Sequence, residues 1–234
     1  MVNPGTKHRA CTVSEALQTR HSCRAFVPDA VPDATVRAIV DVARQSPSGG
    51  NLQPWQIYVV VNGAMTRLRA LLAPKLLAVP GGEPPEYHVY PPNLHEPYRT
   101  RRYKCGEDLY ATLGIGRADK PARLRQMARN YDFFGAPVGL FFAIDRRMGP
   151  PQWADVGMYM QSVMLLAREQ GLHTCPQEIW SAWPQTISEF LGLPPEWMLF
   201  CGMALGYRDE TAPINTLRTD RAPLEECCTF VGES

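Results

Sequence analysis

The sequence predicts a mixed α and β protein in which helices cover both faces of one central sheet. Three runs are apolar at almost every position: "QIYVVV" (residues 56–61), "VGLFFAI" (138–144) and "MLFCGMALG" (198–206). Strands that are apolar on both faces are typical of the middle of a covered sheet, so we expect all three to be central. Residues 1–234 are enough for one sizeable core, and we expect a single domain.

Two helices are expected beside these strands, one before the first strand and one between the second and the third. Asp33 is placed to cap a helix whose apolar residues Val36, Ile39, Val40 and Ala43 recur at helical spacing. The segment 155–170 is apolar nearly all round and is followed by a glycine, which predicts a helix buried in the core or in an oligomer interface.

A third helix is expected near residues 120–130, where Arg123, Arg125 and Arg129 make one side basic. We interpret this side as a solvated surface.

Composition and charge exclude several classes of protein. Apolar residues make up 45% of the chain and charged residues 20%, which is ordinary for a globular protein. A net charge of +1 gives no overall field for nucleic acid or an anionic membrane. No apolar run approaches the roughly 18 residues of a membrane helix, and the first residues lack the apolar segment of a secretory signal. We therefore expect a cytoplasmic protein with a small-molecule partner.

Cysteine and histidine spacing predicts neither disulfides nor a metal site. The seven cysteines are irregularly spaced and form no CxxC pair. His88 and His95 lie seven residues apart in a proline-rich loop, without a third ligand at a recurring spacing. The chain also lacks GxSxG, a Walker sequence and GxGxxG after a strand, which removes the common hydrolase, triphosphatase and dinucleotide-fold signals.

The stretch "SPSGGNLQPWQIYVVV" (46–61) joins the first predicted helix to the first strand. Pro47 disfavours helical geometry at the residue before it. The serines, glycines and asparagine that surround it are more than a turn requires, because any two of them would suffice. Such a loop lets a ligand approach the backbone closely.

Residues 80–116 depart from the regular alternation of helices and strands, because they are rich in proline, tyrosine and arginine. A long irregular stretch in a compact domain is typically disordered or a functional lid. Five aromatic side chains argue against disorder, so we expect an ordered, lid-like insertion. They are Tyr87, Tyr90, Tyr98, Tyr103 and Tyr110.

Two separated segments have the chemistry of a phosphate site. "RHSCRAF" (20–26) combines two guanidinium groups, a hydroxyl and backbone donors within five residues, which suits a phosphate dianion. The alternative is an arginine-rich helix end that caps its own carbonyls. Near the C-terminus, "GYRDETAPINTLRTDRAPLEE" brings Arg218 and Arg221, of which Arg221 is a second candidate phosphate ligand.

Four motifs together carry a resemblance to a known family. In chain order they are "RHSCRAF", "ARQSPSGGNLQPWQIYVV", "GLHTCPQEIW" and "NTLRTDRAPLEE". Over almost the whole chain the sequence resembles the FMN-dependent nitroreductase family. The middle region, "EPYRTRRYKCGEDLYATLGIGRADKPAR" followed by "NYDFFGAPVGLFF", is similar to the nitrobenzoate-reductase-like subgroup.

The resemblance implies an α+β fold with a central, mostly antiparallel sheet flanked by helices, in an intertwined homodimer with FMN at the subunit interface. By resemblance, Arg20, Ser22 and Arg24 hold the phosphate and ribityl end of FMN, and Arg221 completes the phosphate site. His21 stands where a second arginine is commoner, and Ile179 where some relatives have glycine.

The resemblance also implies that the loop 46–53 reaches the flavin of the partner subunit, and that the backbone of residues 176–178 lies beside the flavin edge. The complete set of cofactor-binding candidates is Arg20, His21, Ser22, Arg24, Pro47, Ser48, Gly49, Asn51, Pro176, Gln177, Glu178, Arg218 and Arg221.

The implied activity is reduction of nitroaromatic compounds by NAD(P)H through FMN in a ping-pong mechanism, with no catalytic acid assigned. Two other readings stay open at this point. The same fold with FMN also serves reductive dehalogenation or flavin modification. A non-enzyme alternative is a nucleic-acid-binding module, in which Lys104 and nearby arginines interleave with tyrosines.

Substrate candidates come from the insertion, where a cation can meet a carboxylate on the acceptor. They are Arg99, Arg101, Arg102 and Tyr103. The alternative is that this basic run is a solvated rim without a ligand.

Overall fold

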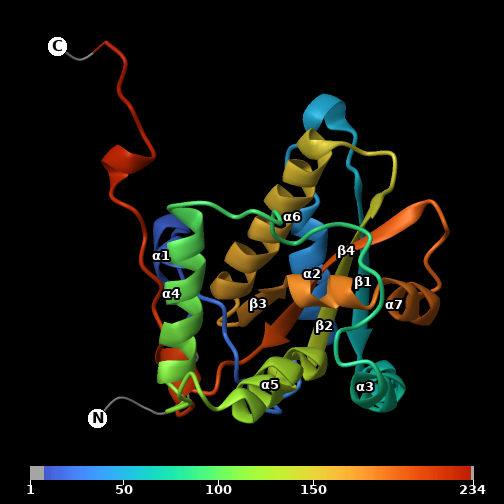
Figure 1. Cartoon of the computed structure of the whole chain (residues 1–234). Helices are drawn as coiled ribbons and strands as arrows, with labels where there is room; N and C mark the ends of the chain where they lie inside the picture. Colours follow the sequence, from blue (N-terminus) through green and yellow to red (C-terminus); the bar gives the residue numbers. More distant parts are fainter. Residues whose placement is uncertain (1–7, 233–234) are drawn as a thin grey trace.

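The computed structural model describes residues 8–232 of the chain. Its sheet has four strands in the order β1-β2-β4-β3, and every neighbouring pair is antiparallel (Figure 1). The strands are β1 (Trp55–Val61), β2 (Val138–Asp145), β3 (His173–Gln177) and β4 (Trp197–Gly206). The predicted α+β fold with an antiparallel sheet is confirmed.

Helices pack on both faces of this sheet. In chain order, the helices are α1 (Val13–Thr19), α2 (Asp33–Ala43), α3 (Asn62–Ala78), α4 (Tyr98–Ala111), α5 (Lys120–Ala128), α6 (Pro150–Glu169) and α7 (Pro184–Leu191). Short 3-10 turns join them: η1 (Gly49–Asn51), η2 (Arg129–Gly135), η3 (Glu178–Ala182), η4 (Pro213–Thr216) and η5 (Leu224–Glu226). No helix of the described part is both long and apolar enough to cross a membrane.

Each face of the sheet has its own apolar core. On one face, Leu140 and Phe142 of β2 pack with buried residues of α2 and α6. On the other face, Phe141 packs with buried residues of α3, η2, η3 and α7. Successive side chains of a strand point to opposite faces, so an apolar run such as β2 supplies both cores.

The central position is confirmed for β2 and β4 but is wrong for β1, which forms one edge of the sheet. Both of its faces contact helices, α3 and α6, although Val59 is 42% exposed. An apolar run therefore indicates that both faces of a strand contact helices. It does not indicate whether both edges of the strand are hydrogen-bonded to neighbouring strands. The opposite edge strand, β3, is not predicted by apolar pattern because it contains Pro176 and polar residues, which an edge strand tolerates.

Helix α6 begins at Pro150, five residues before the expected start, because Gly149 caps it and proline is favourable in the first turn. It ends at Glu169, two residues before the glycine that the sequence indicates, and Gly171 has a φ of 71°. One side is buried, whereas Ala154, Gly157 and Met158 are exposed.

The insertion 80–116 is ordered but not irregular throughout, because it contains helix α4. The expectation of an irregular segment is wrong here for a physical reason: α4 buries no residue, so its sequence has no apolar periodicity to detect. Its charged side chains form ion pairs within the helix and with α5, such as Lys104 with Asp108 and Glu107 with Arg123.

The C-terminal segment after η4 runs along α4 and then extends away from the sheet and its helices (Figure 1). Asp220 and Glu226 of this segment pair with Lys104 and Arg101 of α4. At its end, Phe230 and Val231 are 61% and 95% exposed.

Candidate functional site

The segment 20–26 is fixed between strand β3 and the C-terminal segment. The backbone N–H of Cys23 donates to the carbonyl of Thr174 in β3 over 3.0 Å. The N–H of Arg24 donates to Oδ1 of Asn215 over 2.8 Å, and Nδ2 of Asn215 donates to the carbonyl of Ala25, also over 2.8 Å. Through these hydrogen bonds Asn215, which is 4% exposed, joins the two predicted phosphate segments. It was not predicted as a site residue, although it lies in the motif "NTLRTDR".

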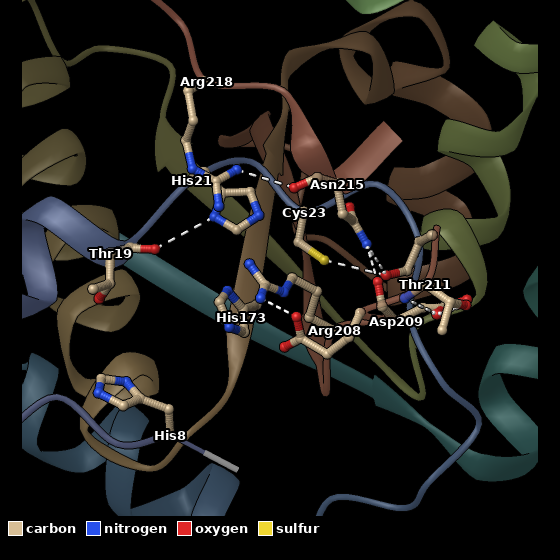
Figure 2. Close-up of polar contacts among 12 residues, drawn as sticks. His8, Thr19, His21, Cys23, His173, Arg208, Asp209, Thr211, Asn215 and Arg218 are labelled. Carbon is tan, nitrogen blue, oxygen red and sulfur yellow. Dashed lines mark hydrogen bonds and ion pairs between the residues drawn. The ribbon is translucent and has the colours of Figure 1, made fainter. Parts of the chain in front are cut away.

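This arrangement brings the predicted cations together. Burial lowers the pKa of the Arg20 guanidinium, and the nearby positive charge of Arg221 lowers it further. Burial also lowers the pKa of His21 to about 4, with a smaller contribution from Arg218, which lies beside it (Figure 2). Among the described residues, no carboxylate forms an ion pair with any of the four arginines Arg20, Arg24, Arg218 and Arg221.

A second layer of nitrogen-rich side chains lies behind His21. Arg168 is 3% exposed, and its Nη1 lies 2.9 Å from Nε2 of His173 and donates to the carbonyl of Leu172 over 3.0 Å. Burial and then the charge of Arg168 lower the pKa of His173 to about 2. The rings of His21 and His173 are 5.2 Å apart (Figure 2). Both imidazoles are therefore neutral at pH 7, and the positive charge belongs to the arginines.

The arginine side chains here fit a phosphate group. Nε of Arg20 and Nε2 of His21 are buried and have no hydrogen-bond partner among the described residues. An unpaired buried polar group is costly, and a cluster of arginines without carboxylates favours an anion of the opposite charge. The His21 Nδ1 lies 3.3 Å from the carbonyl of Thr19, so Nδ1 carries the proton and Nε2 is an acceptor. His21 is therefore not a charge partner for phosphate, whereas the arginines are.

The end of β3 lines a cavity of about 600 Å³, and Arg24 is the member of the two predicted phosphate segments that also lines it. Residues 176–178 line it together with Tyr90 and Arg102 of the insertion. Burial raises the pKa of Glu178, while a hydrogen bond with Tyr90 opposes the increase.

Gln177 lines this cavity, and its backbone rather than its side chain is available for contacts there. Its side chain is 3% exposed and already engaged, because Nε2 donates to the carbonyl of Asn130 over 2.8 Å and Oε1 accepts from Trp180 over 3.3 Å. The Trp180 ring in turn packs directly on Gly202, where any side chain would collide with it. The side chain of Gln177 therefore positions the strand end.

The loop 46–53 lies elsewhere in the chain, against α6 (Figure 1). The N–H of Gly49 donates to Oδ2 of Asp155 over 3.3 Å, and the hydroxyls of Ser46 and Ser162 are 2.7 Å apart. Gly50, Asn51 and Gln53 have positive φ, an unusual backbone that clusters at functional sites. The loop does not line the cavity of about 600 Å³.

One chain thus brings together nine of the thirteen cofactor-binding candidates, in two adjoining groups around β3. The other four, Pro47, Ser48, Gly49 and Asn51, are positioned separately on the exposed loop.

The substrate candidates of the insertion also separate. Arg102 lines the cavity and lies over the ring of Tyr90, 4.0 Å from its centroid. Arg99 pairs with Glu96, and Arg101 pairs with Glu226. Tyr103 faces Arg117 at 5.3 Å, outside the cavity. Tyr90 was noted only as one of five tyrosines, because no pattern in a proline-rich segment indicates which ring faces a cavity.

Comparisons with known proteins agree with this geometry. The model of the nitroreductase family matches residues 17–207. The chain is 37% identical to nitrobenzene nitroreductase of Ectopseudomonas oleovorans, over 94% of this chain and 97% of that protein. It is 38% identical to 4-nitrobenzoate reductase of Pseudomonas putida, over 92% and 94% of the two chains.

A solved structure extends the comparison to the fold. The FMN and NADPH-dependent nitroreductase NfnB from Sphigopyxis sp. strain HMH superposes with a TM-score of 0.92 at 45% identity, covering 95% of this chain and 100% of that chain. The resemblance carried by the sequence motifs is confirmed at the level of the family. The chain belongs to the nitroreductase family.

Proposed function

We propose that this protein is an FMN-dependent oxidoreductase that uses NAD(P)H to reduce nitroaromatic compounds. The observation that carries the proposal is the group of four arginines without carboxylate partners, placed beside a strand end that opens into a cavity of about 600 Å³. Relatives that cover nearly the whole chain are named for reduction of nitrobenzene and 4-nitrobenzoate. FMN bound here would supply the transfer of electron pairs from NAD(P)H to the nitro group.

The proposed roles of the residues follow from their charge and exposure. Arg20 and Arg221 supply charge to the phosphate, with Arg218 beside them, and Ser22 and Arg24 hold the adjoining part of FMN. The backbone of residues 176–178 lies along the ring. Positive charge and backbone donors near the ring would stabilise the negative charge that accumulates on reduction.

The proposal includes a homodimer, because one chain alone leaves the loop 46–53 apart from the other site residues. The exposed side of α6 next to the loop carries small and apolar residues, with Met158 39% exposed. The extended C-terminal segment leaves Phe230 and Val231 exposed, as expected of an arm that packs on a partner. Pro47, Ser48, Gly49 and Asn51 of one protomer would then complete the site of its partner.

The single domain, the lid role of the insertion and a cytoplasmic location stay predictions. Nucleic acid is disfavoured as a partner, because Arg99, Arg101 and Lys104 of the basic run pair with carboxylates.

The first experiment is to identify the cofactor and follow the reaction. We expect the purified protein to be yellow and to release FMN on denaturation, and we expect NAD(P)H oxidation to depend on added nitrobenzene. Chromatography of the released flavin and of the nitrobenzene products checks both. Release of FAD, or protein that stays colourless after incubation with FMN, would refute the proposal.

Light scattering on a size-exclusion column tests the assembly. We expect a mass twice the 26.2 kDa of one chain. A monomer that is saturated with FMN would contradict the shared site.

A further inference from the structure

Arg102 differs from every other cation on the exposed side of α4. Three neighbours are neutralised within the chain: Arg99 by Glu96, Arg101 by Glu226, and Lys104 by Asp108 and Asp220. Arg102 forms no ion pair with any residue of the described part of the chain. It is also the one of these four cations that lines the cavity of about 600 Å³.

The surroundings of Arg102 favour a flat anionic molecule. Its guanidinium carbon lies 4.0 Å from the centroid of the Tyr90 ring, and this ring is 44% exposed. Stacking on an aromatic face holds a guanidinium in one plane. A hydrogen bond also links the side chains of Arg102 and Tyr90, and the remaining N–H donors of the guanidinium can bind a carboxylate.

The charges that face this cavity are few. Arg24 and His88 line it with Arg102, and Glu178 is the one carboxylate that does so. Glu178 already has a partner in the Tyr90 hydroxyl, and it forms no ion pair with Arg102 among the described residues. The guanidinium of Arg102 is therefore open to an anion from outside the chain.

We infer that Arg102 binds the carboxylate of the aromatic acceptor, so that the preferred substrates are nitroaromatic acids rather than neutral nitroarenes. This inference rests on the proposed function, because it places the acceptor in the cavity beside β3. The phosphate of FMN is assigned to the cluster around Arg20 and Arg221, and neither of these two arginines lines the cavity with Arg102. The same anion chemistry would suit the additional phosphate of NADPH, and the experiment separates these two sources.

The central measurement is binding, which needs no turnover. Isothermal titration calorimetry compares 4-nitrobenzoate with the neutral 4-nitrobenzamide on the FMN-loaded protein, without NAD(P)H. We expect Arg102→Met, which keeps the packing on Tyr90 but removes the charge, to weaken 4-nitrobenzoate about tenfold to hundredfold. Binding of 4-nitrobenzamide should change less than threefold. Arg102→Lys should recover part of the loss, because it keeps the charge but not the planar fork.

A matched control is available in the chain. Arg117 also lies over a tyrosine, Tyr103, but lines a separate pocket between α4 and α5. Arg117→Met should leave the binding of both ligands unchanged. An equal loss in Arg102→Met and Arg117→Met would show a general field effect and overturn the inference.

Kinetics then distinguishes the source of the anion. Arg102→Met should lower kcat/KM for 4-nitrobenzoate but not for nitrobenzene, and should leave the NADPH to NADH preference unchanged. A raised KM for NADPH alone, with unchanged binding of 4-nitrobenzoate, would overturn the inference in favour of the coenzyme phosphate. If the wild type reduces nitrobenzene and Arg102→Met keeps the full preference for the acid, only this inference fails. A wild type without flavin or without nitrobenzene reduction contradicts the proposed function, and the binding comparison still decides the role of Arg102.

Discussion

Two arginine-rich regions of this molecule have similar composition and opposite surroundings. On α4, the cations Arg99, Arg101 and Lys104 each pair with a carboxylate of the same chain. In the cluster around residues 20–24, burial and then the nearby positive charge of Arg221 instead lower the pKa of Arg20, and no described carboxylate pairs with either arginine. This difference shows that a basic sequence becomes a candidate anion site where the fold places no carboxylate beside its cations.

Removing a cation from the uncompensated cluster should have the largest effect. We expect Arg20→Ala and Arg221→Ala each to weaken FMN binding about tenfold to hundredfold, because a hydrogen bond to a charged group contributes about 1.5–3 kcal/mol. Fluorescence titration of the apoprotein with FMN gives the Kd. Arg99→Ala is the matched control and should leave this Kd unchanged. Unchanged affinity in both cluster variants would show that the uncompensated arginines do not bind FMN, and would refute the comparison.

The neutral histidines behind the cluster predict an intermediate effect on stability. The folded pKa values of His21 and His173, about 4 and about 2, lie below the ordinary value of 6.5. The unfolded chain therefore takes up protons first as the pH falls. The stability of the native state is fully present above pH 6.5 and is lost progressively as the pH falls from 6.5 toward these folded values.

Thermal unfolding at a series of pH values checks this. For a chain of this length, each kcal/mol lost lowers Tm by about 2–4 °C. His173→Gln keeps an acceptor for Arg168 but cannot titrate, so the fall in Tm between pH 6.5 and pH 4 should be smaller in this variant. The same slope in the variant and the wild type would show that His173 does not contribute.

The smallest effect is expected where charges are already compensated. Both partners of the Arg99–Glu96 pair are solvent-exposed, and such pairs contribute little to stability. Arg99→Ala should leave the urea midpoint of unfolding within experimental error. A clear shift would sharpen the comparison by showing that ion pairs hold α4 in place, since this helix buries no residue.

The sequence was sufficient for features that depend on apolar pattern or on several motifs at once. The central strands β2 and β4 and the long helix α6 follow from their apolar residues, and the family follows from four separated motifs. The edge position of β1 could not be predicted, because pairing depends on which strands lie beside it. Helix α4 could not be predicted, because it buries no residue and its sequence therefore has no apolar periodicity.

The site was predictable to a different degree. The segment 20–24, Arg218 and Arg221 are brought together as the motifs suggest, while their roles stay predictions. Asn215 lies in the C-terminal motif, but its role could not be predicted because it depends on a buried contact with a distant segment. Which cation of α4 lines the cavity could not be inferred, because this helix has no apolar face from which the direction of its side chains could be read.

The two hydrogen bonds of Asn215 with residues 24 and 25 span 191 and 190 residues of sequence. Closing so long a loop has an entropic cost that local contacts do not repay until both ends are present. During synthesis, the phosphate end of the site therefore forms only after almost the entire chain has left the ribosome. A phosphate-bearing ligand that bridges Arg20 and Arg221 would then link the N-terminal and C-terminal parts of the chain. Its release would lower the stability of both parts together.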